Sequence, residues 1–349
     1  MSSNKRHVVD PRAEPFARLL AAPVSHREEL GSKGPPRWCR FCERFAPEVT
    51  FKKEAHVLPS ALGNRSLFSL EECDECNWRG SKLETDLAGF LSLARVTSMV
   101  PPGRGGPIKH KPWSGIDRWM EAMPNDRRLT VRVGAGGDDD GPVRVTLHRD
   151  GMRLSTLVPS YRPANVARAL ARMLLFVVPR EELPALHHIL QWVRGADLWR
   201  YPRYHVARMP GTLPAAGLTL HRPGPGMPSY CVNLYFGHVA LSCFLPDASF
   251  EGPMLEFPAS EPVDTYEYPA DFVVRSEWVS VDVVPGGFVR ASDEEIAVAA
   301  YYRWLEGGRR DGTALDDWLW SQEEVTRRKL VAGQAEFRRR SAEAPQEDG

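Results

Sequence analysis

Hydrophobic residues recur at helical spacing in the middle of the chain. Between Pro163 and Val178 they fall every three to four positions, with Arg168 and Arg172 on the opposite side, and Pro179 ends the run. The apolar positions are Val166, Leu170, Met173, Leu174 and Val177. A period near 3.6 residues predicts an amphipathic helix that packs on a core. Two more helices are predicted at residues 181–194 and 296–305, the latter preceded by a capping box at residues 292–295.

Other stretches alternate apolar and polar residues, which is the pattern of half-buried strands. Residues 129–133 and 143–147 alternate in this way on either side of a turn rich in Gly and Asp, which predicts a hairpin. Further strands are predicted at residues 204–208, 218–221, 230–239, 240–245 and 278–284. The sequence therefore predicts an α+β fold with an antiparallel sheet and C-terminal helices.

A Pro- and Gly-rich stretch at residues 101–107 has no apolar periodicity and predicts a boundary. The length of 349 residues fits two domains. The predicted order is a flexible leader, a small module, a linker, a larger α+β accessory domain for recognition or regulation, and a polar tail. Their expected bounds are 1–35, 36–100, 101–115, 116–335 and 336–349.

Composition and charge narrow the class of protein. Hydrophobic residues make up 42% and charged residues 26% of the chain, which excludes a disordered or fibrous protein. The longest apolar run, at residues 173–178, is too short to span a bilayer, and no signal peptide opens the chain, so a cytoplasmic protein without membrane contact is expected. The net charge is zero, but residues 1–115 carry 18 Lys and Arg against 13 Asp and Glu, a local net charge of +5. A basic N-terminal part can face a polyanion.

Four of the six cysteines form two pairs, Cys39-x-x-Cys42 and Cys73-x-x-Cys76. Four thiolates match the tetrahedral preference of Zn²⁺, and each pair supplies two neighbouring ligands. A zinc ion held by four cysteines keeps no open position for water, so the predicted ion stabilises the fold and does no chemistry.

Between the pairs stand the sequences Glu54-Ala55-His56-Val57-Leu58-Pro59 and Leu62-Gly63-Asn64, and Asn77 directly follows the last cysteine. This arrangement resembles the HNH endonucleases of the zinc-stapled ββα-metal type, over residues 36–93. The resemblance implies a strand that presents His56 and a helix that presents metal ligands to the same point. It implies that His56 is the general base and that Asn77 helps to hold Mg²⁺ or Mn²⁺ for hydrolysis of DNA, with RNA as the alternative substrate.

The remaining metal ligands are open from the sequence. Most members of the family carry a ligand immediately before the histidine, where this chain has Ala55. Glu54 lies two residues before His56 and shares its strand face, so it is one candidate. Glu84 lies two helical turns after Asn77 and is another, although it also fits a capping box. Asn64 is a candidate for the middle Asn of the family pattern, but it lies earlier than that residue usually does.

Basic and aromatic residues surround these motifs, a composition suited to binding phosphates. The candidate nucleic-acid contacts are Arg40, Lys52, Lys53, Arg65, Arg79 and Lys82. The alternative is a solvated basic surface over a small aromatic core.

Two other functions stay open from the sequence. The first is a non-catalytic zinc module that binds nucleic acid or protein, with Ala55 marking a lost site. The second is an accessory domain that senses a small ligand and uses the zinc module as its output. The accessory domain is also a candidate surface for a homo-oligomer or a partner protein. A role in mobile-element biology or anti-phage defence is suggested by analogy alone.

Overall fold

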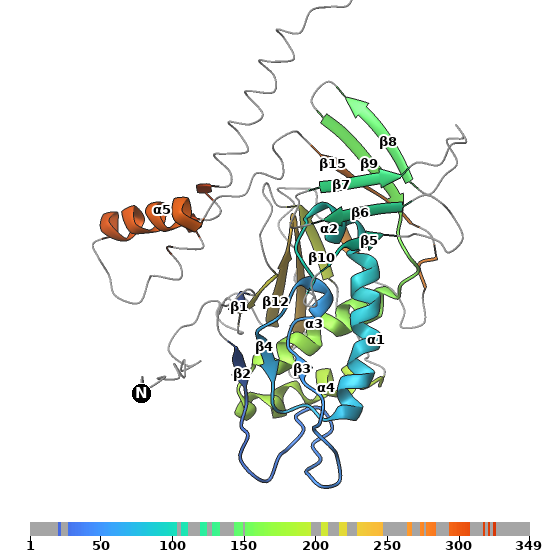
Figure 1. Cartoon of the computed structure of the whole chain (residues 1–349). Helices are drawn as coiled ribbons and strands as arrows, with labels where there is room; N and C mark the ends of the chain where they lie inside the picture. The colour runs from blue at the N-terminus through green and yellow to red at the C-terminus, as the bar shows by residue number, and fades with distance from the viewer. Residues whose placement is uncertain are drawn as a thin grey trace, which may run out of the picture.

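The computed structural model describes the N-terminal module almost completely and the rest of the chain in segments. The described residues are 20–21, 27–102, 106–110, 119–123, 128–132, 143–148, 151–196, 204–208, 216–221, 229–246, 264–266, 273–275, 277–283, 293–307, 317, 320–321 and 324–325. The fold is a mixture of helices and mostly antiparallel sheets, with a helix near the C-terminus, as the sequence predicts (Figure 1).

A six-stranded antiparallel sheet forms the central layer, in the order β1-β11-β12-β13-β10-β14. Its strands are β1 (Leu20–Ala21), β10 (Tyr204–Arg208), β11 (Gly217–His221), β12 (Ser229–Phe236), β13 (Val239–Pro246) and β14 (Asp264–Tyr266). The predicted strands at 204–208, 218–221, 230–239 and 240–245 are confirmed, whereas β1 and β14 are too short to be seen as alternation.

The predicted amphipathic helix is α3 (Pro163–Val177), which contacts β12 and β13 of this sheet. Proline is compatible with the first turn of a helix, where its missing N–H has no intrahelical partner. The predicted helix at 181–194 divides between Leu186 and His187 into a 3₁₀ helix, η2 (Arg180–Leu186), which contains Pro184, and a short α-helix, α4 (His187–Val193).

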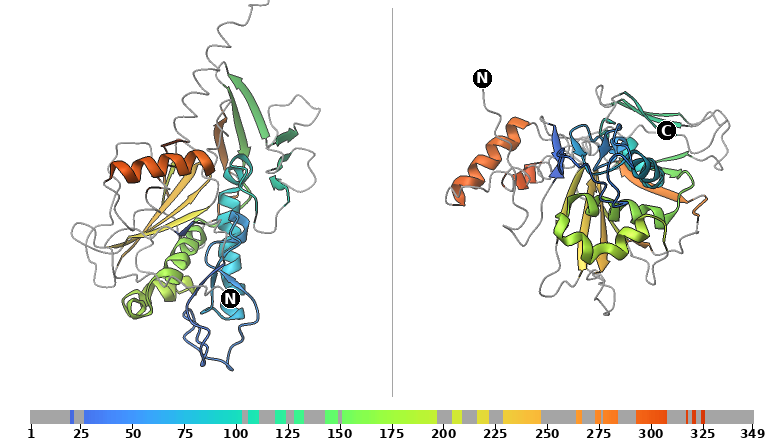
Figure 2. Two further views of the ribbon diagram at one scale, coloured as in Figure 1. Left: turned by 60° about the vertical axis from the view of Figure 1, so that its left-hand side comes forward. Right: turned by 90° about the horizontal axis from the view of Figure 1, so that it is seen from below.

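The N-terminal module packs against α3 through its helix α1 (Asp74–Phe90), which runs beside it (Figure 2). It holds a three-stranded sheet in the order β2-β4-β3, with β2 (Glu28–Leu30), β3 (Ala55–His56) and β4 (Leu67–Ser69). A 3₁₀ turn, η1 (Ser60–Leu62), lies between β3 and β4, and two helices, α1 (Asp74–Phe90) and α2 (Ser92–Thr97), follow. Helix α1 turns Gly80, Leu83 and Leu87 toward α3, because these positions share one helical face.

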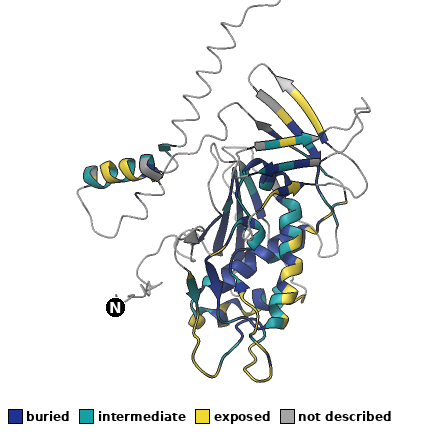
Figure 3. Ribbon diagram, viewed as in Figure 1, coloured by how far each residue is buried: buried dark blue, intermediate teal, exposed yellow. Residues whose placement is uncertain are grey.

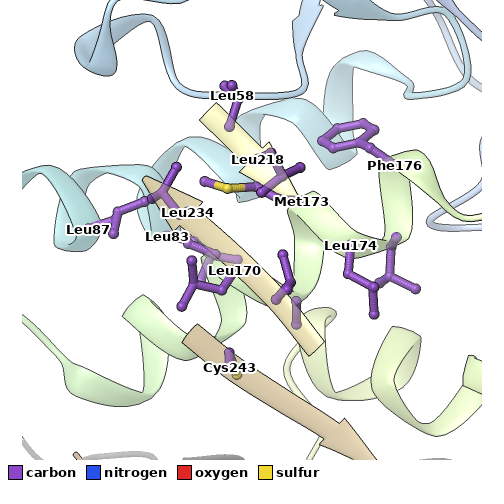
Figure 4. Close-up of a cluster of buried hydrophobic side chains, with 14 of the residues drawn as sticks. Leu58, Leu83, Leu87, Leu170, Met173, Leu174, Phe176, Leu218, Leu234 and Cys243 are labelled. Atoms are coloured by element: carbon purple, nitrogen blue, oxygen red, sulfur yellow. The ribbon is translucent and has the colours of Figure 1, made fainter. Parts of the chain in front are cut away.

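One hydrophobic core joins the module to the six-stranded sheet. It includes Leu58 from the module, Leu87 from α1, Leu170 from α3 and Leu234 from the sheet, all fully buried (Figures 3 and 4). Within the described residues, one packed core thus spans parts of the predicted module and of the predicted accessory domain. Strand β2 also lies within the residues predicted as a flexible leader, so the module's sheet starts upstream of residue 36.

Two further three-stranded sheets share a second, smaller core around Val96, Met120 and Leu154. Their orders are β5-β6-β7 and β15-β9-β8, with β5 (Ile108–His110), β6 (Trp119–Met123), β7 (Arg128–Arg132), β8 (Val143–His148), β9 (Gly151–Leu157) and β15 (Trp278–Val283). The predicted hairpin is wrong: β7 pairs with β6, and β8 pairs with β9. Strand β5 falls within the predicted linker.

Helix α5 (Asp293–Glu306) confirms the predicted C-terminal helix. Ser292 of the predicted capping box, much of the predicted 101–115 linker and the 336–349 tail lie outside the described residues. Among the described helices, none combines the length and the apolar character that crossing a membrane requires.

Candidate active site and metal centre

The four predicted cysteine ligands meet at one point. Cys39 and Cys42 lie in a tight turn in which Glu43 adopts a positive φ of 60°, and Cys73 and Cys76 lie at the start of α1. All four sulfurs are within 4.8 Å of one another, and the Sγ atoms of Cys42 and Cys73 are 3.8 Å apart. A tetrahedral ion with Zn–S bonds of about 2.3 Å places its sulfurs about 3.8 Å apart. The four cysteines can therefore hold a structural metal ion such as zinc.

Hydrogen bonds favour the charged form of one of these thiols. The backbone N–H of Cys73 donates to Sγ of Cys39 over 3.4 Å. A hydrogen bond from the Cys76 thiol, together with backbone N–H groups, lowers the pKa of Cys39 to about 5. Burial has the opposite effect on its neighbour and raises the pKa of Cys73 to about 12. A thiolate is the form that binds metal, so these hydrogen bonds favour the form of Cys39 that ligation requires.

His56 ends β3 and lies against an aromatic ring of the neighbouring strand. Its imidazole centre is 4.7 Å from the ring centre of Phe68, its partner across the β3–β4 ladder. The amide nitrogen of Asn64 lies 3.4 Å from Nδ1 of His56. These two contacts fix the orientation of the imidazole, while the residue stays partly exposed.

Asn64 closes the loop between β3 and β4. Its Nδ2 donates to the carbonyls of Leu58 over 2.7 Å and Leu67 over 2.8 Å, and its Oδ1 accepts from the N–H groups of Ser66 and Leu67. Both amide hydrogens are thus used by carbonyls, and the longer approach to His56 is a packing contact. Asn64 is fully buried, and its hydrogen bonds fix the loop that follows His56.

Asn77 reaches the strand of His56 from the first turn of α1. Its Nδ2 donates to the backbone carbonyl of Glu54 over 3.2 Å. The next residue, Ala55, is fully buried, whereas the Glu54 side chain is 58% exposed. The structure therefore brings the Asn77 side chain to the backbone of Glu54, two residues before His56.

Glu84 contacts α3 instead. Its carboxylate forms an ion pair with Arg172 of α3, in which Nη1 of Arg172 lies 2.7 Å from Oε1 of Glu84. Arg172 also donates to both carboxylate oxygens of Glu72, over 3.2 Å from Nε and 2.7 Å from Nη2. The position of Glu84 two turns beyond Asn77 thus serves the packing of α1 on α3.

Most of the predicted phosphate contacts are exposed, but one is not. The exposed ones are Lys52, Lys53, Arg65, Arg79 and Lys82. Of these, Lys82 lies over the ring of Trp78, itself 55% exposed, at 3.9 Å. Arg40 is the exception: it is 6% exposed, pairs with Glu71 at 2.6 Å and donates to three carbonyls at the end of α3, those of Leu175, Phe176 and Val178. Arg40 is thus a helix-capping residue without access to a polyanion.

Sequence reasoning missed three residues around the site: Arg27, Phe68 and Arg172. Arg172 was assigned to the polar side of an amphipathic helix, but that side packs on α1. Phe68 carries no motif, and only its register opposite His56 reveals it. Arg27 directly precedes the three-residue strand β2, which the sequence does not predict because the surrounding segment is rich in proline.

Two family models match parts of this chain. Residues 39–87 match the model described as HNH endonuclease, and residues 291–326, which include α5, match one described as "Protein of unknown function (DUF2934)". No curated protein and no solved structure matches the chain. The first match covers both cysteine pairs, His56, Asn64 and Asn77, and it identifies an HNH module of the nuclease kind in the N-terminal region.

Proposed function

We propose that this protein is a metal-dependent endonuclease that hydrolyses phosphodiester bonds of DNA, with His56 as the general base. The observation that supports this most is the meeting of β3 and α1, where Asn77 contacts the backbone of Glu54 two residues before His56. Imidazole titrates near neutral pH, so it can accept a proton from water that attacks phosphorus. Phe68 and Asn64 hold the ring in place for that step.

Asn77 and Glu54 are the proposed ligands of a divalent cation. Nδ2 of Asn77 is committed to the Glu54 carbonyl, so its Oδ1 is the atom available to a metal. Amide and carboxylate oxygens suit Mg²⁺ or Mn²⁺, and Mg²⁺ keeps several waters, so two protein ligands suffice. Such an ion supplies Lewis-acid stabilisation of the charge that develops on the phosphate. We leave Glu84 out of this set because its carboxylate pairs with Arg172.

The cysteine cluster is proposed to hold Zn²⁺ with a structural role. Its four sulfurs occupy the whole tetrahedron, which leaves no position for a substrate. Because Cys76 and Asn77 are adjacent on α1, an ion at the cysteines also fixes the direction of Asn77.

Cleavage of plasmid, single-stranded DNA and RNA in Mg²⁺ and in Mn²⁺ tests the proposal. The His56→Ala variant should cut about 10²- to 10⁴-fold more slowly than the unchanged protein, the range expected for loss of a general base. His187→Ala is the matched control, because His187 is an exposed histidine on α4, and it should cut at the normal rate.

Equal rates for His56→Ala and the unchanged protein would remove His56 from the mechanism. No cutting of any substrate by the unchanged protein, combined with retained nucleic-acid binding, would favour a non-catalytic zinc module.

A further inference from the structure

Arg27 lies at the edge of the proposed site, upstream of the residues that match the HNH family. It immediately precedes β2, which pairs with β4 so that Glu29 lies opposite Phe68. His56 lies opposite Phe68 on the other side of β4. The short sheet thus brings the N-terminal segment within reach of His56.

One aromatic ring is shared by the proposed base and a cation. The Arg27 guanidinium lies 4.2 Å from the ring centre of Phe68, and the His56 ring centre lies 4.7 Å from it. The two distances together place the guanidinium at most about 9 Å from the imidazole. A base, an attacking water, the phosphorus and an oxygen held by a guanidinium span about 8–10 Å when joined by ordinary hydrogen bonds. The upper limit on the separation of His56 and Arg27 is therefore compatible with contact of both groups to one phosphodiester.

The Arg27 side chain is held in one orientation before any substrate binds. Nε donates to Oε1 of Glu29 over 2.8 Å, and Nη2 pairs with Oε1 of Glu54 over 2.6 Å. These carboxylates take two of the five N–H donors of the guanidinium, and the side chain is 48% exposed. An arginine fixed in this way loses little conformational freedom when it binds a phosphate, whose geometry its planar donors match.

The ion pair with Arg27 also leaves Glu54 able to act as a metal ligand. Arg27 contacts only Oε1 of Glu54 within the described residues, and a carboxylate offers about four lone-pair positions on its two oxygens. A divalent cation on Glu54 would then lie next to the guanidinium of Arg27, where both could contact one phosphate.

We infer that Arg27 is a catalytic residue that binds a non-bridging oxygen of the scissile phosphate and stabilises its charge in the transition state. The inference rests on the proposed nuclease function. It extends the active site to a segment outside residues 39–87.

The test compares single-turnover DNA cleavage by the full chain with Arg27→Gln, Arg27→Lys and Lys33→Gln variants. Lys33 is the matched control, because it lies in the same segment, is 64% exposed and pairs with the same Glu29 over 2.5 Å. Arg27→Gln should slow cleavage about 100-fold or more, the usual loss when a charge-stabilising donor is removed. Arg27→Lys should recover part of that loss, and Lys33→Gln should cut within about twofold of the unchanged protein.

Two binding measurements separate a phosphate contact from an effect through Glu54. In Ca²⁺, the slope of log affinity for DNA against log salt should fall by about 1 in Arg27→Gln, because one phosphate contact is lost. The Mn²⁺ affinity of Arg27→Gln, measured by calorimetry without DNA, should stay within about twofold of normal.

Each other outcome overturns the inference. If Arg27→Gln cuts as fast as Lys33→Gln while the unchanged protein is active, the nuclease function stands and Arg27 is not catalytic. A large change of Mn²⁺ affinity in Arg27→Gln would show that Arg27 acts on Glu54. If the unchanged protein cuts nothing, the proposed function fails and this inference fails with it.

Discussion

Gly80 of α1 and Arg172 of α3 form a tight contact between the N-terminal module and the central helix. A Cβ atom at residue 80 would lie 2.5 Å from Cζ of Arg172. A flexible arginine can usually move away from such an atom. Here Glu72 holds it from one side and Glu84 from the other, and its side chain is only 3% exposed. We therefore expect Gly80→Ala to destabilise the protein, although alanine is the better helix former.

The magnitude follows from two opposing effects. Alanine in place of glycine inside a helix contributes about 1 kcal/mol of stability. Displacing Arg172 breaks a pair with Glu72, whose side chain is 1% exposed, and breaking a buried ion pair costs about 3–5 kcal/mol. The free energy of unfolding should therefore fall by about 2–4 kcal/mol in Gly80→Ala.

The sign should reverse when the guanidinium is removed. A background with Arg172→Ala and Glu72→Gln lacks the three guanidinium atoms that lie nearest to a Cβ at residue 80, and it leaves no unpaired charge at residue 72. Adding Gly80→Ala to that background should raise the free energy of unfolding by about 0.5–1 kcal/mol, the ordinary helix-propensity effect.

Urea unfolding of the four full-length proteins, followed by circular dichroism at one fixed zinc concentration, measures both effects. The difference between them is the coupling energy of Gly80 with its ion-paired neighbour. If Gly80→Ala stabilises both backgrounds equally, Arg172 is able to move and the ion pairs do not hold it.

Three further predictions concern His110, Asn64 and the cysteine cluster. His110 is buried beside Arg95, and burial lowers the pKa of His110 from 6.5 to about 4. The unfolded chain binds this proton near pH 6.5 and the folded chain only near pH 4. The free energy of unfolding should therefore fall by up to about 3 kcal/mol as the pH drops through this window. In urea titrations at several pH values, the His110→Gln variant should lack this part of the pH dependence. Asn64→Ala removes the hydrogen-bond partner of four buried backbone groups, so it should lower the free energy of unfolding by about 2–4 kcal/mol. The cleavage rate should fall as well. Normal activity in this variant would contradict the role given to the loop. Metal analysis should find one zinc ion per chain. A chelator should lower the melting temperature of the unchanged protein by several degrees, and it should have no such effect on Cys76→Ser. A protein without zinc whose melting temperature does not respond to the chelator would contradict the metal centre.

The local patterns of this chain predict much of its structure. The cysteine spacing and the residues around His56 predict the small module, because the four cysteines and the strand of His56 all lie within one short stretch of the sequence. Helix α3 is predicted because its apolar face has a regular period, and four strands of the central sheet show alternation. Pairing is harder, because alternation shows that a segment is a strand but not which strand it meets. The wrong hairpin between residues 129–133 and 143–147 has this origin.

Burial of charges could not be predicted from these patterns. Arg172 and Arg40 have the sequence context of exposed residues, and only the packing of α3 between the module and the sheet encloses them. Glu84 looked equally suited to a metal and to a cap, and its partner lies 88 residues away in sequence. Arg27 became visible only through the register of β2 on β4.

Arg40 lies between Cys39 and Cys42 in the sequence and caps the end of α3. Helix α3 in turn packs on the six-stranded sheet. An ion bound at the cysteines would therefore stabilise the N-terminal module and the six-stranded sheet together. By mass action, each tenfold fall in free metal above the dissociation constant removes about 1.4 kcal/mol from the stability of the whole chain. With a metal ion held by the cysteines, the amount of folded protein in a cell would therefore follow the supply of that metal.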